Sequence, residues 1–403
     1  MNTFEKFNLS DNLMMAIKRL GFTKPTQVQE KSIPHIVAGK DVVGESATGS
    51  GKTLAFGCGV VEHVIPKQGL QALILTPTRE LAEQVKEELK KLSSQKHLKV
   101  ISIYGGVAID PQIEGLQRAE VAVATPGRLL DHLQRGTIDT SKIKLLVLDE
   151  ADRMLDMGFI DDVKQIIQNC PRKRQTLFFS ATISSEIEKL THKYMDQPIE
   201  VRATSMVDPK KLKQIYYDVE NNMKLSLLIH LLKEERSGLV MVFCNTRRMT
   251  DFVVKNLRAN QIKAIPIHGG LTQNKRTKTI QMFEGAKAGV LVCTDVAARG
   301  LHIEDVSHIY NYDLPKDSKD YVHRIGRTAR AGEEGKVVNL LSDRDHDNFS
   351  RILRDYTSFE IKNVRKPHVE RIRAVKGDDD RRGPRKTGFP PRGRRSNAHH
   401  RRR

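Results

Sequence analysis

The chain has 403 residues and a formal net charge of +19, and 38% of its residues are hydrophobic. This length exceeds one ordinary hydrophobic core and favours two domains. No apolar run approaches the ~20 residues of a membrane helix, and no basic segment precedes an apolar one at the start, so we expect neither a membrane partner nor a secretory signal. We expect buried free thiols, and hence a cytoplasmic protein, from the four widely spaced cysteines Cys58, Cys170, Cys244 and Cys293.

Residues 4–37 carry apolar positions at helical spacing, with Leu9, Leu13 and Ile17 among them. From Val42 onward, short apolar runs alternate with amphipathic helices. The runs are Ala72–Leu75, Val100–Tyr104, Val121–Ala124, Leu145–Leu148 and Thr176–Phe179. This alternation predicts an α/β domain with a parallel sheet covered by helices on both faces. In such sheets ligands bind beyond the carboxyl ends of the strands.

The alternation pauses in the polar, proline-bearing residues 204–211, which we interpret as a linker. It then resumes, with expected strands at Leu239–Phe243, Lys263–Ile267, Gly289–Cys293, His308–Asn311 and Lys336–Leu340. We therefore predict an N-terminal domain over residues 1–203, a C-terminal domain over residues 212–375 and a tail over residues 376–403.

The tail carries much of the positive charge. Between Lys376 and Arg403 there are eleven Lys or Arg residues and three Asp residues. Because apolar periodicity stops before it, we expect this basic tail to be disordered. A basic body with a more basic tail predicts a polyanionic partner, most often nucleic acid, although charge does not distinguish RNA from DNA.

A glycine-rich turn lies between the apolar run at Val42 and a helical pattern that begins at Leu54. Successive backbone N–H groups of such a turn, together with the start of the next helix, bind phosphate. We expect Lys52 to lie along the β- and γ-phosphates and Thr53 to bind magnesium. The predicted phosphate-binding residues are Ser46, Ala47, Thr48, Gly49, Ser50, Gly51, Lys52 and Thr53.

An acidic cluster follows the apolar strand Leu145–Leu148 directly. Asp149 is suited to hold magnesium, partly through water, and Glu150 to orient and deprotonate the attacking water. Combined with the glycine-rich turn, this cluster indicates that a bound nucleoside triphosphate is hydrolysed.

The order and spacing of these motifs and of those below resemble the DEAD-box family of ATP-dependent RNA helicases of superfamily 2, over roughly residues 4–345. The resemblance implies two tandem RecA-like domains, with ATP and Mg²⁺ in the cleft between them. It also implies RNA as the partner, as a single strand or short duplex. The family binds the RNA backbone without sequence specificity, hydrolyses ATP and unwinds short duplexes locally.

For the nucleotide, the resemblance assigns adenine recognition to Gln29 and packing on the base to the aromatic residues Phe4 and Phe22. An amide suits adenine because it offers a donor and an acceptor side by side. Ser180 and Thr182 match a triplet that couples hydrolysis to domain movement. The family usually has Ala and Gln where this chain has Ser46 and Ala47, but both positions act mainly through the backbone.

For RNA, the resemblance assigns loops of both domains to contacts with the backbone rather than the bases. In the first domain the matching residues are Thr78, Arg79, Gly106, Thr125 and Arg128. In the second domain they are Gly269, Arg276 and Thr294.

The second domain also completes the nucleotide site. The family uses the positions of Arg327 and Arg330 as arginine fingers on the γ-phosphate, which they reach only when the domains close, and the position of His323 for coupling. Where the family usually has an Asp that contacts the ribose, this chain has His302. A neutral imidazole can still donate or accept one hydrogen bond.

Two other functions stay open from the sequence. One is a DNA translocase of the same superfamily, which would lack the Gln29 element. The other is an RNA chaperone or clamp that acts mainly through RNA binding by the tail, against which the intact Lys52, Glu150 and Arg327 argue as a sole role.

Overall fold

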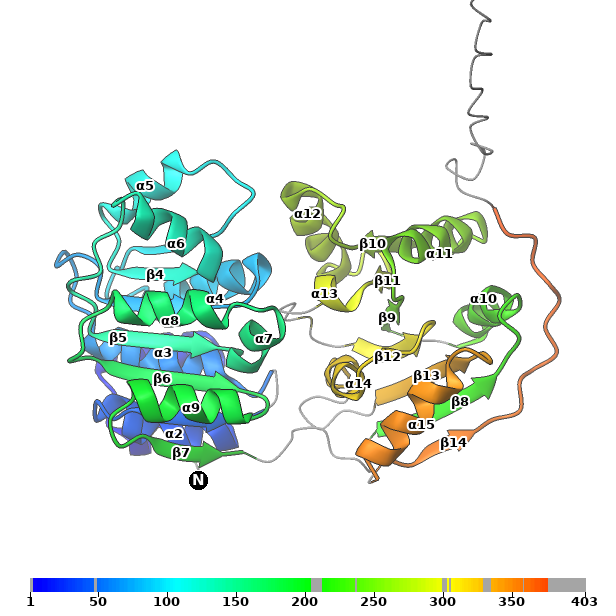
Figure 1. Cartoon of the computed structure of the whole chain (residues 1–403), viewed down its shortest axis with the longest axis horizontal. Helices are drawn as coiled ribbons and strands as arrows, with labels where there is room; N and C mark the ends of the chain where they lie inside the picture. Colours follow the sequence, from blue (N-terminus) through cyan, green and yellow to red (C-terminus); the bar gives the residue numbers. More distant parts are fainter. Residues whose placement is uncertain are drawn as a thin grey trace, which may run out of the picture.

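The computed structural model describes residues 3–46, 49–203, 212–235, 238–298, 303, 306–328, 335–357 and 359–375. The predicted linker and tail lie outside these residues, as do Ala47, Thr48, His302 and Arg330. The described chain contains two seven-stranded parallel sheets, one after the other in sequence, with helices packed on them (Figure 1). The predicted α/β class, with two tandem RecA-like domains, is confirmed.

The sheet of the first domain has the order β3-β4-β2-β5-β6-β1-β7. Its strands are β1 (Val42–Glu45), β2 (Ala72–Leu75), β3 (Val100–Ile103), β4 (Val121–Ala124), β5 (Leu145–Asp149), β6 (Gln175–Ser180) and β7 (Ile199–Arg202). The central strands are buried throughout because helices cover both faces, which explains why they read as continuous apolar runs.

The first domain begins with a short 3₁₀ helix, η1 (Phe4–Phe7). Its helices are α1 (Asp11–Arg19), α2 (Gln27–Val37), α3 (Lys52–His63), α4 (Arg79–Leu92), α5 (Asp110–Leu116), α6 (Pro126–Gln134), α7 (Ala151–Asp156), α8 (Ile160–Gln168) and α9 (Ser185–Tyr194). One face of the sheet packs against α2, α3 and α4, through side chains such as Phe56 and Leu89, and α1 packs on α3 and α4. The other packs against α8 and α9, through Val163 and Ile187.

The sheet of the second domain has the order β10-β11-β9-β12-β13-β8-β14. Its strands are β8 (Leu212–Asp218), β9 (Leu239–Phe243), β10 (Ala264–Ile267), β11 (Val290–Cys293), β12 (Val306–Asn311), β13 (Gly335–Leu341) and β14 (Ile361–Asn363). Its helices are α10 (Lys224–Glu234), α11 (Arg247–Ala259), α12 (Gln273–Glu284), α13 (Asp295–Ala298), α14 (Ser318–Ile325) and α15 (His346–Asp355).

Three strands have no counterpart among the apolar runs of the sequence: β7, β8 and β14. β7 and β14 each form one of the two edges of their sheet, and β8 lies next to β14. Edge strands are partly exposed and carry polar residues, as in the sequence Ile-Glu-Val-Arg of β7. The search for continuous apolar runs therefore finds the centre of each sheet and misses these strands near one side.

All four cysteines are free and buried, as predicted. No helix in the part of the chain that the structure describes combines the length and apolar character needed to cross a bilayer.

Candidate nucleotide and RNA site

The glycine-rich turn joins the end of β1 to the start of α3. Gly49 and Gly51 have φ angles of +81° and +90°, in the left-handed region that favours glycine. Lys52 is the first residue of α3, and its buried Nζ donates to the carbonyl oxygen of Ser46 at 3.1 Å. The turn thus places the lysine and the N-terminus of α3 at one point, which suits a phosphate group.

Ser46, which departs from the family's usual residue, takes part in holding the turn. Its backbone N–H donates to the carbonyl oxygen of Ser180 at 2.9 Å, and its hydroxyl accepts from Ser50 Oγ at 3.0 Å. The serine therefore closes the turn through its side chain and ties the turn to the end of β6 through its backbone.

Gln29 connects the start of α2 to this turn. Its Oε1 accepts from the backbone N–H of Thr26 at 2.9 Å, and its Nε2 donates to the carbonyl oxygen of Gly51 at 3.0 Å. The hydroxyl of Thr26 adds a second link, to the carbonyl oxygen of Ser50 at 2.7 Å. An amide has two donor hydrogens and an oxygen with two lone pairs, so Gln29 retains one donor and one acceptor for an adenine edge.

The two aromatic residues assigned to the base differ in exposure. Phe4 is 2% exposed and packs in the core, with its ring 5.9 Å from that of Phe7. Phe22 is 44% exposed. Phe4 therefore anchors η1 in the core, whereas the ring of Phe22 is open to solvent.

The acidic pair lies at the carboxyl end of β5. Burial raises the pKa of Asp149 to about 7, against the attraction of Lys52, which lowers it. Oδ1 of Asp149 and Oε2 of Glu150 are buried and accept no hydrogen bond from the described residues. Glu150 also has φ +54°, a left-handed conformation that side chains other than glycine rarely adopt. Orphaned buried oxygens and a strained backbone at one point are features of a functional site.

Asp152 connects this acidic cluster to the end of β6. Its Oδ2 accepts from the backbone N–H groups of Ala181 and Thr182, each at 3.2 Å, while Ser180 Oγ accepts from the N–H of Asp152 at 3.2 Å. The triplet assigned to coupling is therefore tied to the acidic cluster by several hydrogen bonds. A movement of the triplet would therefore be transmitted to the acidic cluster.

The loops assigned to RNA in the first domain follow β2, β3 and β4, all at the carboxyl edge of the sheet. Thr78 caps α4 by accepting from the N–H of Leu81. Gly106 has φ +82°, and a Cβ there would lie 2.1 Å from Nη1 of Arg79, so the arginine packs directly on the glycine. Arg128 Nη2 donates to the carbonyl oxygen of Val107 at 3.1 Å, which brings the two arginines to the same loop.

In the second domain, the loop after β10 is held by His268. Its Nδ1 accepts from the N–H of Gly270 at 3.1 Å, so its Nε2 donates to Asp251 Oδ1 at 2.9 Å. A Cβ on Gly269 would lie 3.2 Å from Nη2 of Arg247, which covers the loop.

Arg276 lies on α12 and contacts the first domain. Its Nε is 2.7 Å from Oε1 of Glu80, and Gln273 Nε2 donates to the same oxygen at 3.1 Å. Glu80 follows Arg79 at the start of α4, so this pair joins the RNA-binding elements of the two domains directly.

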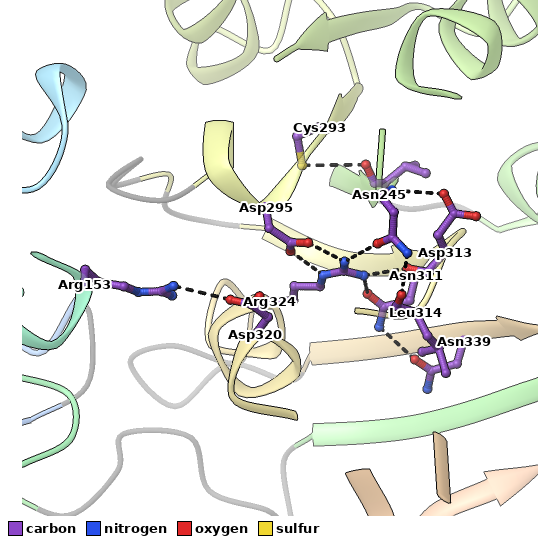
Figure 2. A network of polar contacts seen from close by, with 11 residues as sticks. Arg153, Asn245, Cys293, Asp295, Asn311, Asp313, Leu314, Asp320, Arg324 and Asn339 are labelled. Atoms are coloured by element: carbon purple, nitrogen blue, oxygen red, sulfur yellow. Dashed lines mark hydrogen bonds and ion pairs between the residues drawn. The ribbon is translucent and has the colours of Figure 1, made fainter. Parts of the chain in front are cut away.

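A second contact joins the domains beside the nucleotide site. Arg153 Nη1 of the first domain donates to Oδ1 of Asp320 at 3.4 Å (Figure 2). His323 and Arg327 line the same cavity between the domains as this pair. The structure thus brings Arg327 to the interface with the domain that carries the glycine-rich turn.

Arg324 fixes the helix that precedes Arg327. It is 1% exposed and lies at the centre of a polar network (Figure 2). The guanidinium forms a two-pronged contact with Asp295, at 2.6 and 2.7 Å, and donates to Asn311 at 2.9 Å. The N–H of Arg327 in turn donates to the carbonyl oxygen of Arg324 at 3.1 Å. The backbone at Arg327 is therefore anchored to the second domain.

Comparison with known proteins identifies the family. Residues 26–190 match the DEAD/DEAH box helicase family, and residues 223–332 match the helicase conserved C-terminal domain. The chain is 42% identical to the DEAD-box ATP-dependent RNA helicase CshA of Bacillus subtilis, over 91% of this chain and 75% of that protein. The chain belongs to the DEAD-box family.

Solved DEAD-box structures share its two-domain fold. A Dbp5 structure from S. cerevisiae bound to RNA and ADP BeF3 is 29% identical, covers 91% of this chain and 96% of its own, and has a TM-score of 0.81. A DEAD box protein from Methanococcus jannaschii is 41% identical, covers 90% of this chain and 99% of its own, and has a TM-score of 0.56.

Several residues of this DEAD-box site were given no role from the sequence: Glu80, Asp152, Arg153, Arg247, Asp320 and Arg324. Each acts on another protein group rather than in one of the assigned roles. Charged residues on helices usually face solvent, so sequence alone offers little reason to select them. The available signal was adjacency, because every one of them except Arg247 lies within three residues of an assigned position.

Proposed function

We propose that this DEAD-box protein is an ATP-dependent RNA helicase that hydrolyses ATP when RNA brings its two domains together, and thereby unwinds short RNA duplexes. The observation that carries the proposal is the division of the ATPase groups. The glycine-rich turn, Asp149 and Glu150 belong to one domain, whereas Arg327 belongs to the other and lines the interface.

In this mechanism Lys52 and the N–H groups at the start of α3 hold the phosphates of ATP. Glu150 accepts a proton from the water that attacks the γ-phosphorus. Arg327 offsets the charge that develops on the transferred phosphoryl group. In phosphoryl-transfer enzymes, an arginine of this kind contributes on the order of 10³–10⁵ in rate.

We include Mg²⁺ in the proposed site, held by Asp149 and the hydroxyl of Thr53. The buried Oδ1 of Asp149, which lacks a hydrogen-bond donor among the described residues, suits a hard cation that prefers oxygen ligands. The ion would neutralise charge on the phosphates. Its positive charge would also favour the ionised form of Asp149, whose pKa burial raises.

We propose that the two domains lie in a closed arrangement similar to that of Dbp5. The relative from Methanococcus jannaschii is closer in sequence, yet its TM-score is 0.56, whereas Dbp5 bound to RNA and ADP BeF3 scores 0.81. Both comparisons cover 90% or more of this chain, so we attribute the difference to the placement of the two domains. The contacts Arg153–Asp320 and Arg276–Glu80 would hold that placement.

We propose that RNA lies across the loops of Arg79, Gly106 and Arg128 in the first domain and those of Gly269 and Thr294 in the second. These groups are glycine backbone, a hydroxyl and guanidinium groups, which suit phosphate and ribose. They carry little information about base identity. Binding across both domains would link RNA occupancy to closure, which is the condition for Arg327 to act.

The decisive experiment compares ATPase stimulation by RNA and by DNA of equal length and sequence, for the unmodified protein and for Glu150→Gln. We expect stronger stimulation by RNA, and loss of that activity in the variant with nucleotide binding retained. Glu186→Gln, an exposed glutamate on α9, is the matched control and should behave like the unmodified protein. Stronger stimulation by DNA would favour a translocase, and full activity of Glu150→Gln would remove Glu150 from the base role.

The domain limits at 1–203 and 212–375, with a linker between them and a basic tail after them, remain part of this proposal. A cytoplasmic location also remains a proposal. The four free, buried thiols support it, because such thiols persist in a reducing compartment.

A further inference from the structure

The chain does not end with the second sheet. After β14 it runs as an extended segment over α10 and α11 (Figure 1, orange to red). We call residues 364–375 the strap. Its inner side chains Val364, Val369 and Ile372 are partly buried and pack against the core beneath β8 and β9. The strap is therefore packed on the second domain through an apolar face.

Hydrogen bonds to two buried helix residues fix the strap. Ser226 Oγ of α10 accepts from the N–H of Ile372 at 2.9 Å. Asn256 of α11 accepts from the N–H of Val375 at 2.7 Å, and its Nδ2 lies 3.2 Å from the carbonyl oxygen of the same residue. Asn256 is 0% exposed. Its Nδ2 also donates to the carbonyl oxygen of Phe252 at 2.9 Å, whereas its Oδ1 accepts from the strap. A buried amide oxygen without a donor is costly, so the strap helps to satisfy the asparagine at this position.

The outer face of the strap is basic. Arg365, Lys366, Arg371 and Arg373 are all exposed, and none of them forms an ion pair with another described residue. Glu370 is the single acidic residue among residues 364–375. Because the backbone beneath these cations is already ordered, a polyanion that binds them has less conformational entropy to overcome.

We propose that the outer face of the strap binds the phosphate backbone of RNA outside the channel between the domains, with Asn256 as the residue that positions it. This proposal rests on the proposed function. Asn256 lies nine residues along α11 from Arg247, or about 14 Å at 1.5 Å per residue. RNA that extends past the loop of Arg247 and Gly269 can therefore reach the strap.

The test removes the four outward charges with Arg365→Ala/Lys366→Ala/Arg371→Ala/Arg373→Ala in the full chain. The matched control, Lys40→Ala/Lys142→Ala/Lys144→Ala/Lys173→Ala, removes four exposed lysines before β1, β5 and β6, at the opposite edge of the first sheet from the RNA loops. Both variants have the same net charge. Any difference between them therefore reports position rather than total charge.

Binding is measured across a salt series without ATP, with a short single strand that spans only the channel and with the same strand extended by a hairpin. For the extended RNA, we expect the strap variant to lower the slope of log affinity against log salt by about 3 to 4, since each of four phosphate contacts contributes about 0.7 on a single strand and about 0.9 on a duplex. The short strand should bind as before. The proposal would be overturned if the strap variant and the control variant lost the same RNA affinity. It would also be overturned if the strap variant lost the same affinity for the short and the extended RNA.

Asn256→Ala tests positioning separately, because it leaves every strap charge in place. We expect it to lose affinity for the extended RNA while ATPase stimulation by the short strand stays unchanged, and Asn256→Gln to restore part of the affinity. An Asn256→Ala protein that binds the extended RNA normally would contradict the positioning role. Failure of the proposed function would appear differently, as absent RNA stimulation in the unmodified protein.

Discussion

Asp149→Asn is expected to stabilise the nucleotide-free protein while abolishing its ATPase activity. Burial raises the pKa of Asp149 from 3.8 to about 7, so the folded state binds a proton more tightly than the unfolded state. Stability therefore falls as pH rises from the unfolded value toward the folded value, and stays low above it. Asparagine approximates the neutral carboxyl group and would avoid this loss.

The size of this stabilisation follows from the pKa of Asp149, which burial raises by about three units. At 1.36 kcal/mol per unit, the variant should be more stable by about 4 kcal/mol at pH 8, but by only about 1 kcal/mol at pH 4.5. Urea unfolding followed by circular dichroism measures this, because the chain has no tryptophan to report by fluorescence. The exposed Asp161→Asn is the control and should change little at either pH. A gain from Asp149→Asn that is equal at both pH values would refute the reasoning.

Two further changes test the RNA loops and the interface. Gly106→Ala places a Cβ 2.1 Å from Nη1 of Arg79 and should weaken RNA binding about tenfold in a titration, whereas Gly136→Ala, also at positive φ but with open space around it, should not. Asp320→Arg puts two cations together at the Arg153 contact and should raise the RNA concentration for half-maximal ATPase activity about tenfold. The double variant with Arg153→Asp should recover part of that loss, and an absence of recovery would mean that the pair does not hold the domains together.

Much of the fold was accessible from the sequence because the central strands are buried on both faces. The runs Ala72–Leu75 and Val121–Ala124 match β2 and β4 residue for residue. The polar edge strand β7 could not be found in this way, since only its partner β1 makes it a strand. Its pairing is a tertiary interaction that local periodicity does not encode.

The features of the candidate site also fall into those that the sequence implied and those that depend on tertiary packing. Lys52 follows the turn after β1 and Asp149 is the last residue of β5, so their place at the carboxyl edge was implied by the parallel sheet. The burial of Phe4 was not implied, because an aromatic residue near a binding motif reads equally well as a contact to the ligand. The bond from Gln29 to Gly51 depends on how α2 packs against α3, which the spacing of neither element specifies.

The buried network of Arg324 has a consequence for how the enzyme would be controlled. An arginine held by Asp295 and Asn311 cannot swing, and the backbone of Arg327 is tied to it. In the proposed mechanism, the second domain would then deliver Arg327 to the phosphate as a rigid body. Hydrolysis rate would become a measure of the separation between the two domains, so a ligand or protein that props them apart by a few ångströms could switch the enzyme off without touching the nucleotide.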